Sequence, residues 1–200
     1  MKKSDFLNAV YERLFSLYGE CSCPLKHETP FQLLAAVMLS AQCRDDRVNQ
    51  VTETLFAVAP DARSMAELPV EKIAEIIRPL GLYAVKARNL QNAARRIVEV
   101  YRGEVPKNME DLTTLAGIGR KSANVLLGNA FGIPGFPVDT HVNRVLNRLG
   151  AVAVGEPEKI EKIVVRAVSS GLSDGFADPP RENRPVVWWW WNDDMSHVPR

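Results

Sequence analysis

The sequence predicts an all-α fold. Apolar residues recur three and four positions apart through most of the chain, which is the spacing that places them on one face of a helix. No segment alternates apolar and polar residues for long enough to indicate a β-strand. Capping residues and prolines precede the apolar stretches and glycines follow several of them, so we expect short helices joined by irregular turns.

The first half of the chain begins with two well-marked helices. Ser4 can cap the first, which has an apolar face and ends before Gly19. Thr29 and Pro30 open the second, over residues 31–41, which is apolar on nearly all sides and therefore expected to be buried. Further helical segments are indicated by Val48, Val51, Leu55 and Phe56, by a capping box of Ser64 and Glu67, and by Pro69 ahead of Ile73, Ile76 and Ile77.

The second half predicts five more helices. A long one with an apolar stripe from Leu90 to Tyr101 ends at Gly103. The others are Met109–Leu115 capped by Asn108, Arg120–Phe131, Thr140–Leu149 capped by Asp139 and stopped by Gly150, and a last helix that Pro157 opens through Ile160, Ile163, Val164 and Ala167. Helical periodicity stops near Ser169, and the run Trp188–Trp191 fits neither a helix face nor a strand face. Residues 169–200 are therefore predicted to be an irregular tail.

Composition narrows the class of protein. Hydrophobic residues make up 46% and charged residues 24% of the 200 residues, as in ordinary globular proteins. The net charge of +1 provides no general positive field, so a nucleic-acid surface would have to come from local clusters of basic residues. Three cysteines (Cys21, Cys23 and Cys43) are too few for a disulfide framework. Without an apolar stretch near the roughly 20 residues of a membrane span, we expect a cytoplasmic protein.

A glycine turn between two predicted helices is the first candidate for function. In Leu115–Lys121, Gly117 and Gly119 flank Ile118, and their backbone can adopt conformations that a side chain would forbid. Amide groups at such a turn, at a helix N-terminus, can hold a phosphate oxygen, while Ile118 anchors the turn in the core. Taken alone, a Gly-x-Gly segment is equally compatible with an ordinary turn between helices.

Lys121 and Asp139 are the candidate chemical groups. Lys121 lies in the first turn of a helix beside Arg120, where its protonated form is disfavoured, and such lysines become nucleophiles and form Schiff bases. Asp139, at the start of the next helix, can stabilise positive charge or carry a proton. The plainer alternatives are a solvated surface lysine and an aspartate that only caps its helix.

Several segments together resemble one family. Leu115–Val125 with Val138–His141 is similar to endonuclease III, a helix-hairpin-helix DNA glycosylase/AP lyase. The matching segments upstream of Asp139 are, in order, Leu39-Ser40-Ala41-Gln42, Gly81-Leu82-Tyr83 and Gly103-Glu104-Val105-Pro106. The likeness covers about residues 5–165. Ala116 replaces a proline that is usual in the family, which should loosen the hairpin slightly.

The resemblance implies a particular architecture. We expect the helix-hairpin-helix DNA glycosylase fold, with two helical subdomains and a cleft between them. Residues 22–133 would form a helical barrel domain that carries the hairpin, and residues 1–21 with 134–168 would form a second helical domain from both termini. Residues 169–200 would be the irregular tail, without the family's iron–sulfur loop.

The resemblance also implies an activity. Lys121 would attack C1′ of an oxidised or ring-saturated pyrimidine nucleotide in duplex DNA, expel the base, and hold the sugar as a Schiff base. β-Elimination would then cut the strand 3′ to the abasic site, and Asp139 would activate the lysine and stabilise cationic sugar character. The protein would be a monomer acting on the bacterial nucleoid.

Residues expected to contact DNA follow from the same resemblance. Gln42 would fill the space that the extruded base leaves, and Leu82 would wedge the opposite strand. Taken alone, Gln42 would more simply be a helix-end cap and Leu82 a core residue. The other expected DNA contacts are Gly117, Ile118, Gly119, Arg120, His141 and Arg144.

The cysteine pattern departs from the family. Endonuclease III usually carries four C-terminal cysteines that hold a 4Fe–4S cluster, whereas no cysteine follows Cys43 in this chain. The cluster is therefore not expected, and no other metal or cofactor is predicted. The stability of the C-terminal helices and the affinity for DNA are the properties that this loss would affect.

Two alternatives remain open from the sequence. A glycosylase of the same superfamily with another base specificity would share the fold, although adenine-specific members typically lack the hairpin lysine. A non-catalytic helix-hairpin-helix DNA-binding protein would use the hairpin only to grip the DNA backbone.

Overall fold

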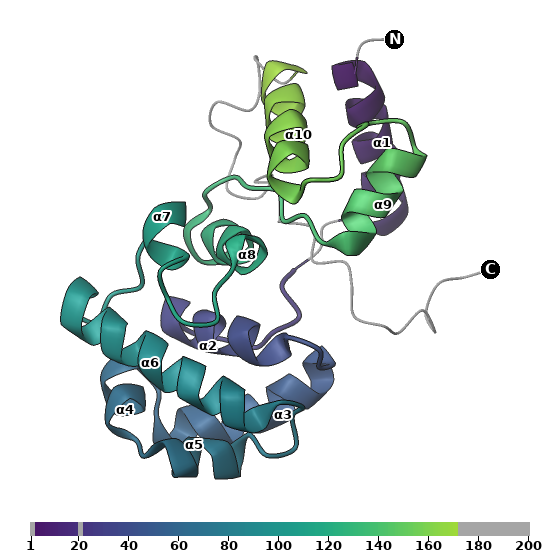
Figure 1. Ribbon diagram of the computed structural model, residues 1–200. Coiled ribbons are helices and arrows are strands. Elements are labelled where there is room, and N and C mark those ends of the chain that lie inside the picture. Colours follow the sequence, from purple (N-terminus) through teal and green to yellow (C-terminus); the bar gives the residue numbers. More distant parts are fainter. Residues whose placement is uncertain (1–2, 20–21, 172–200) are drawn as a thin grey trace.

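The computed structural model describes residues 3–19 and 22–171, and all regular secondary structure in these two ranges is α-helical. The all-α prediction is therefore confirmed. The ten helices of this part of the chain are α1 (Lys3–Tyr18), α2 (Pro30–Ser40), α3 (Asp45–Val58), α4 (Ala62–Glu67), α5 (Val70–Ile76), α6 (Tyr83–Tyr101), α7 (Met109–Leu112), α8 (Arg120–Phe131), α9 (Thr140–Arg148) and α10 (Pro157–Gly171) (Figure 1).

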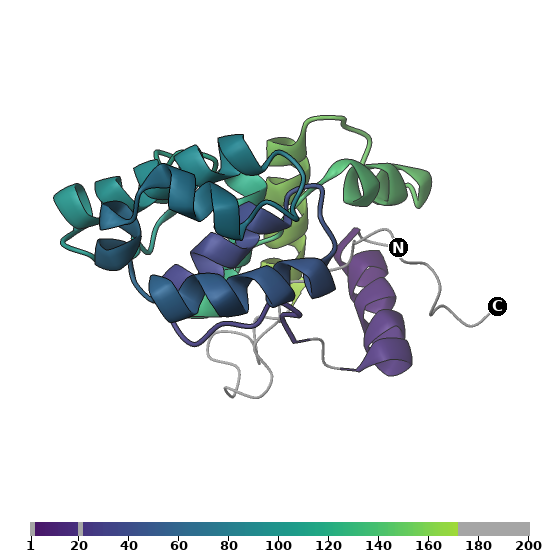
Figure 2. The same ribbon diagram turned by 90° about the horizontal axis from the view of Figure 1, so that it is seen from below.

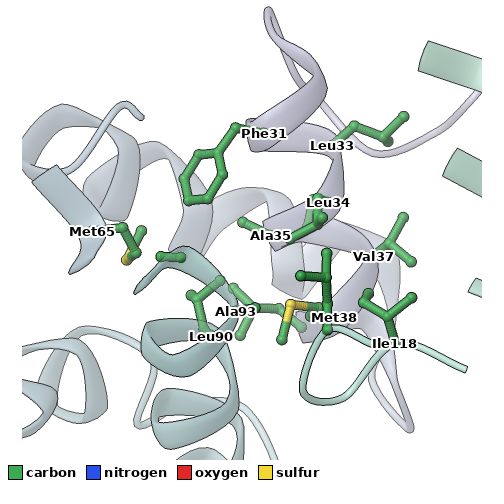
Figure 3. Close-up of a cluster of buried hydrophobic side chains, with 14 of the residues drawn as sticks. Phe31, Leu33, Leu34, Ala35, Val37, Met38, Met65, Leu90, Ala93 and Ile118 are labelled. Carbon is green, nitrogen blue, oxygen red and sulfur yellow. The ribbon is translucent and has the colours of Figure 1, made fainter. Parts of the chain in front are cut away.

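Helix α2 is the centre of the larger of two hydrophobic clusters. Residues 31–39 are all buried, as the apolar sequence of this helix predicts. Thr29 caps the helix by accepting the amide hydrogen of Gln32 at 3.2 Å, and Pro30 occupies its first position. Met38 from α2 lies close to Leu90 and Ala93 from α6 (Figure 3). Helices α3 to α8 contribute most of the rest, together with Leu25 ahead of α2 and residues of the loops such as Leu80, Val105 and Ile118.

A second hydrophobic cluster is built from both ends of the described chain. Helices α1 and α10 pack against each other, and α9 lies near them, away from α2 to α6 (Figures 1 and 2). The buried members of this cluster are Leu7, Val138, Leu146, Ala151, Val152, Ile160 and Val164. The chain passes from the larger cluster to this one through the loop between α8 and α9.

An ion pair joins the helices that bear the two clusters. Arg120, at the start of α8, donates from Nε to Glu161 Oε2 at 2.7 Å and from Nη2 to Glu161 Oε1 at 3.0 Å. Glu161 belongs to α10, so this two-pronged contact spans 41 positions of sequence. A bidentate arginine–carboxylate pair fixes orientation as well as distance. It therefore helps to set how α8 and α10 lie relative to each other.

Some predicted helix ends are wrong. The capping box of the fourth helix consists of Asp61 and Ser64, and Ser64 occupies the third helical position instead of the cap. The Asp61 carboxylate accepts the Ser64 amide hydrogen at 2.8 Å, so the helix begins before Ser64 and Glu67 is its last residue. Helix α1 already includes Lys3, which places Ser4 inside the helix.

The ends of two more helices, α7 and α10, differ from the predicted ends. Helix α7 ends at Leu112, three residues before the predicted end, because Thr113 and Thr114 direct their hydroxyls to nearby backbone carbonyls and compete with helical pairing. Helix α10 continues to Gly171, so the first three residues of the predicted irregular tail are helical. The remainder of that tail, residues 172–200, lies outside the described residues.

Candidate active site

The glycine hairpin lies between α7 and α8, as predicted. Gly117 has a φ of +82°, and a Cβ there would approach Asn89 Nδ2 at 3.2 Å and Met38 Cε at 3.3 Å. Only glycine meets both conditions without strain. Ile118 is buried in the larger cluster, near Met38 and Val37 (Figure 3). The hairpin is thus held against α2 and α6 through its core side.

The outer side of the hairpin is open. Gly119 is the N-cap residue of α8, and a Cβ added to it would meet no atom within 4 Å. The amide groups of the first helical turn lack intrahelical acceptors, and the helix dipole adds partial positive charge at this end. Together they form a suitable site for an anion such as a phosphate group.

Lys121 and Asp139 lie together at this end of α8. Lys121 Nζ is 3.3 Å from Asp139 Oδ2, and the side chains are 47% and 16% exposed. The other carboxylate oxygen of Asp139 accepts the amide hydrogens of His141 at 3.0 Å and Val142 at 2.8 Å, so Asp139 also caps α9. The amine is accessible to a large ligand, while the carboxylate is held in one orientation.

The surroundings of Asp139 keep its carboxyl ionised. Burial of the carboxyl would raise its pKa, but the Val142 amide, the charge and hydrogen bond of Lys121, and the His141 amide lower it more. The net result is a pKa below the usual 3.8. At neutral pH the group is therefore a carboxylate, which can accept a proton or stabilise a cation.

Gln42 and Leu82 are exposed and have unusual backbone conformations. Gln42 follows α2 with a φ of +56°, and Leu82 precedes α6 with a φ of +57° and is 62% exposed. A left-handed conformation costs a residue with a side chain about 1–2 kcal/mol. Such strain persists where the surrounding structure enforces it, and it concentrates at functional sites. The exposure of Leu82 does not fit the core reading, and Gln42 directly follows Ala41, the C-cap residue of α2.

Among the other residues expected to contact DNA, the side chains of Arg120 and Ile118 are engaged or buried within the protein, whereas that of Arg144 is exposed. Arg120 is engaged by Glu161, which raises the pKa of its guanidinium further, so this group is already committed within the protein. Ile118 can offer only its backbone because its side chain is buried. Arg144 is exposed on α9 and donates from Nη2 to His141 Nδ1 at 3.1 Å, which places these two side chains together.

Sequence reasoning missed a buried asparagine beside the site. Asn124 lies one helical turn after Lys121, is 2% exposed, and its Nδ2 has no hydrogen-bond partner. A Cβ at Gly135 would collide with Asn124 Oδ1. The loop that leads into Asp139 therefore packs directly on α8. No local pattern could have indicated this contact, since both residues are common in helices and loops.

Comparison with known proteins identifies the family. Residues 35–169 match the family described as HhH-GPD superfamily base excision DNA repair protein, and the chain belongs to it. It is 47% identical over 156 residues to endonuclease III of Synechocystis sp., which covers 78% of this chain and 71% of that protein. It is 42% identical over 144 residues to endonuclease III of Escherichia coli K12, which covers 72% and 68% of the two chains.

Solved structures agree with this assignment. A trapped covalent intermediate of endonuclease III with DNA, in a complex with an estranged adenine, has a TM-score of 0.79 and 37% identity, covering 86% of this chain and 81% of that one. A non-covalent endonuclease III–DNA complex has a TM-score of 0.77 and 33% identity, covering 93% and 94%. The helix-hairpin-helix DNA glycosylase fold expected from the sequence is therefore confirmed.

The described residues offer neither a metal site nor a membrane span. In residues 3–19 and 22–171, no three histidine, cysteine or acidic side chains are grouped so that they could hold a metal ion. Within the same ranges, no helix combines the length and apolar character that crossing a membrane requires.

Proposed function

We propose that this chain is a bifunctional DNA glycosylase/AP lyase that removes oxidised or ring-saturated pyrimidines from duplex DNA. The observation that carries this proposal is the 3.3 Å approach of Lys121 Nζ to Asp139 Oδ2 at the open end of α8. An amine nucleophile, a neighbouring carboxylate and an anion-binding helix terminus are the groups that this chemistry needs. Relatives of the chain are named endonuclease III, and one of them has been trapped covalently on DNA.

The reaction begins at the sugar of the damaged nucleotide. Lys121 Nζ loses a proton, for which the Asp139 carboxylate is an acceptor within reach. Its lone pair then forms a bond to C1′ while the C1′–N bond breaks, and the departing base takes the proton that Asp139 had accepted, which restores the carboxylate. The carboxylate stabilises the positive charge that develops on the sugar as that bond lengthens.

The second half of the reaction breaks the DNA strand. Opening of the sugar ring leaves a Schiff base between Lys121 Nζ and C1′. Loss of a proton from C2′ then expels the 3′ oxygen with its phosphate, which is β-elimination on the 3′ side. Water hydrolyses the Schiff base and regenerates the lysine.

Recognition of duplex DNA would use the surfaces around this pair. The hairpin amides from Gly117 to Gly119 and the start of α8 would bind a backbone phosphate, and Arg144 with His141 would bind a second. Gln42 would occupy the gap that the extruded base leaves, and Leu82 would wedge the opposite strand. We further propose that the enzyme acts as a monomer on nucleoid DNA.

The predicted division into domains fits this use. The larger hydrophobic cluster falls within residues 22–133, and α8, which contributes to it, bears Lys121. The second cluster draws on both flanking segments, 1–21 and 134–168, and Asp139 directly follows its member Val138. The reacting pair would then be assembled where the two domains meet. The Arg120–Glu161 ion pair would keep the domains in register.

The chain does not fit a 4Fe–4S cluster. Such a cluster needs four cysteine ligands, and this sequence contains three cysteines in all, one of which, Cys43, contacts a buried lysine. We propose that base release and strand cleavage at Lys121 proceed without iron. Colorimetric assays for iron and sulfide on purified protein would contradict this if they gave a stoichiometric cluster.

Borohydride reduction tests the proposed function. With a duplex carrying a ring-saturated pyrimidine, the protein should form a stable covalent adduct, and Lys121→Ala should form none. Lys159→Ala is the matched control because it removes an exposed lysine on α10, which is ion-paired with Glu156 just ahead of that helix. Failure of the folded protein to form an adduct on any lesion would favour a non-catalytic binder. An adduct only on purine lesions would indicate another base specificity.

A further inference from the structure

Lys86 is a buried lysine in the first turn of α6. Lys86 is only 7% exposed, and its Nζ donates a hydrogen bond to the backbone carbonyl of Leu39 at 2.9 Å. Nζ also lies 3.4 Å from Cys43 Sγ. Lysine is almost never buried to this degree unless its amine has a partner.

The first contact, to the Leu39 carbonyl, supplies a hydrogen-bond donor at the C-terminal end of α2. The last carbonyls of a helix have no intrahelical donors and carry partial negative charge, which a cation stabilises. Ser40 Oγ satisfies the Val37 carbonyl at 3.0 Å, and the Cys43 amide satisfies the Ser40 carbonyl at 3.0 Å. The Leu39 carbonyl, between them, receives its donor from Lys86, across 47 positions of sequence.

The second contact lies on the other side of Gln42. Leu39 precedes Gln42 by three positions and Cys43 follows it directly, so Lys86 holds the loop on both sides of this residue. Gln42 has a positive φ, a conformation that its surroundings must enforce.

The same lysine is tied to Leu82 through its backbone. The Lys86 amide donates to the Leu82 carbonyl at 3.0 Å, in the first turn of α6. Leu82 also has a positive φ and is the N-cap residue of this helix. One residue therefore contacts both of the loops that carry exposed, strained residues, although these loops are 40 positions apart.

We propose that Lys86 is a positioning residue that sets the spacing of Gln42 and Leu82 so that both enter the DNA helix together. This inference rests on the proposed function, in which these two residues replace the extruded base and wedge the opposite strand. Without the ammonium, the Leu39 carbonyl would lose its donor and the Gln42 loop could relax. The cost would then fall on base extrusion, while the chemistry at Lys121 would be unaffected.

Single-stranded DNA separates extrusion from chemistry. An abasic site in a single strand has no opposite strand to wedge and no stacked gap to fill, so strand cleavage there needs only Lys121 and its neighbours. Lys86→Met should lower single-turnover base release from a lesion duplex by about tenfold or more, which is the range expected from losing a hydrogen bond to a charged group. The rate of cleavage at a single-stranded abasic site should change by less than about twofold, which is smaller than the effect of losing one hydrogen bond to a charged group.

A spectroscopic readout reports the positioning directly. 2-Aminopurine opposite an abasic site becomes more fluorescent when it leaves the base stack. Protein that carries only Lys121→Ala, which prevents cleavage, should raise this fluorescence at saturating concentration. Adding Lys86→Met should reduce the rise, whereas Lys72→Met, which removes an exposed lysine paired with Glu75 on α5, should not.

Two more variants keep the proposal testable if Lys86→Met does not fold. Lys86→Gln keeps a donor for the Leu39 carbonyl but not the charge, and Cys43→Ala removes the contact beyond Gln42 while keeping the lysine. Each should show a smaller loss with the same bias toward duplex substrate. Equal losses on duplex and single-stranded DNA, or no loss on either, would overturn the proposal. If the wild-type protein cleaves neither substrate, it is the proposed function that fails.

Discussion

The carboxylate of Asp139 divides its two oxygens between two tasks. Oδ2 faces Lys121 Nζ at 3.3 Å, whereas Oδ1 accepts the amide hydrogens of His141 and Val142 that begin α9. The helix cap therefore fixes the orientation of the group that would serve the lysine. A residue that the sequence could assign either to capping or to chemistry is placed to do both.

Asp139→Asn separates these two tasks. Asparagine caps helices about as well as aspartate, so α9 should keep its cap and the free energy of unfolding should fall only by the contribution of the ionised carboxyl. The variant cannot accept a proton or balance positive charge, so single-turnover base release should slow by about 10²- to 10⁴-fold. Gel-shift titration with lesion duplex should show nearly unchanged affinity. A parallel loss of affinity and rate would contradict the proposed role.

The stability of the protein should depend on pH through Asp139. Its pKa in the folded protein lies below the usual 3.8, so the folded state binds this proton less readily than the unfolded state. The resulting stabilisation is present above pH 3.8 and is lost as the pH falls through the lower, folded value.

Denaturant titrations at several pH values measure this contribution. The difference in unfolding free energy between the wild-type protein and Asp139→Asn should shrink as the pH falls below 3.8. A difference that stays constant from pH 7 to the acid limit of folding would show that the carboxyl is not perturbed.

Gly135→Ala should disturb the loop that delivers Asp139. The new Cβ would collide with Asn124 Oδ1, and Asn124 is buried and has little room to move. We expect a loss of about 1–3 kcal/mol in the free energy of unfolding, as for other overpacked sites, together with slower base release.

Two companion variants test the cause of that loss. Gly155→Ala is the control because its Cβ would meet no atom within 4 Å, and it should be nearly neutral. Asn124→Ala combined with Gly135→Ala should recover part of the loss, since it removes the colliding atom. Additive losses would mean that the two residues do not interact.

The two hairpin glycines should respond differently to alanine. At Gly117, a side chain would face both a φ of +82° and contacts of 3.2–3.3 Å with Asn89 and Met38. Gly117→Ala should therefore cost about 1–2 kcal/mol of unfolding free energy from the backbone alone, and weaken DNA binding. Gly119→Ala has open space and a negative φ, so its effect on stability should be smaller. Thermal unfolding with gel-shift titration distinguishes them, and equal effects would contradict the hairpin geometry.

Local sequence patterns predicted the parts of the fold that depend on neighbouring residues. Thr29, Asn108 and Asp139 all cap helices as predicted, because the side-chain oxygen of each accepts an amide hydrogen two or three positions away. The apolar sequence of α2 likewise predicted its burial. The hairpin with Lys121 was also visible, since its glycines and lysine are contiguous.

Contacts between distant segments were not predictable in this way. The partner of Arg120 lies 41 positions away and that of Lys86 lies 47 positions away, so neither pairing leaves a local signal. Lys86 in the sequence looks like any lysine at the start of an exposed helix. The left-handed backbone of Gln42 and Leu82 was also hidden, because no glycine or asparagine stands at either position.

Peptide mapping of the borohydride-trapped adduct tests the central claim most directly. After reduction on an abasic-site duplex and digestion of protein and DNA, mass spectrometry should find the sugar remnant on Lys121. The adduct should disappear in Lys121→Ala and persist in Lys86→Met. A remnant on any other amine, or undiminished trapping by Lys121→Ala, would contradict the assignment of Lys121 as the nucleophile.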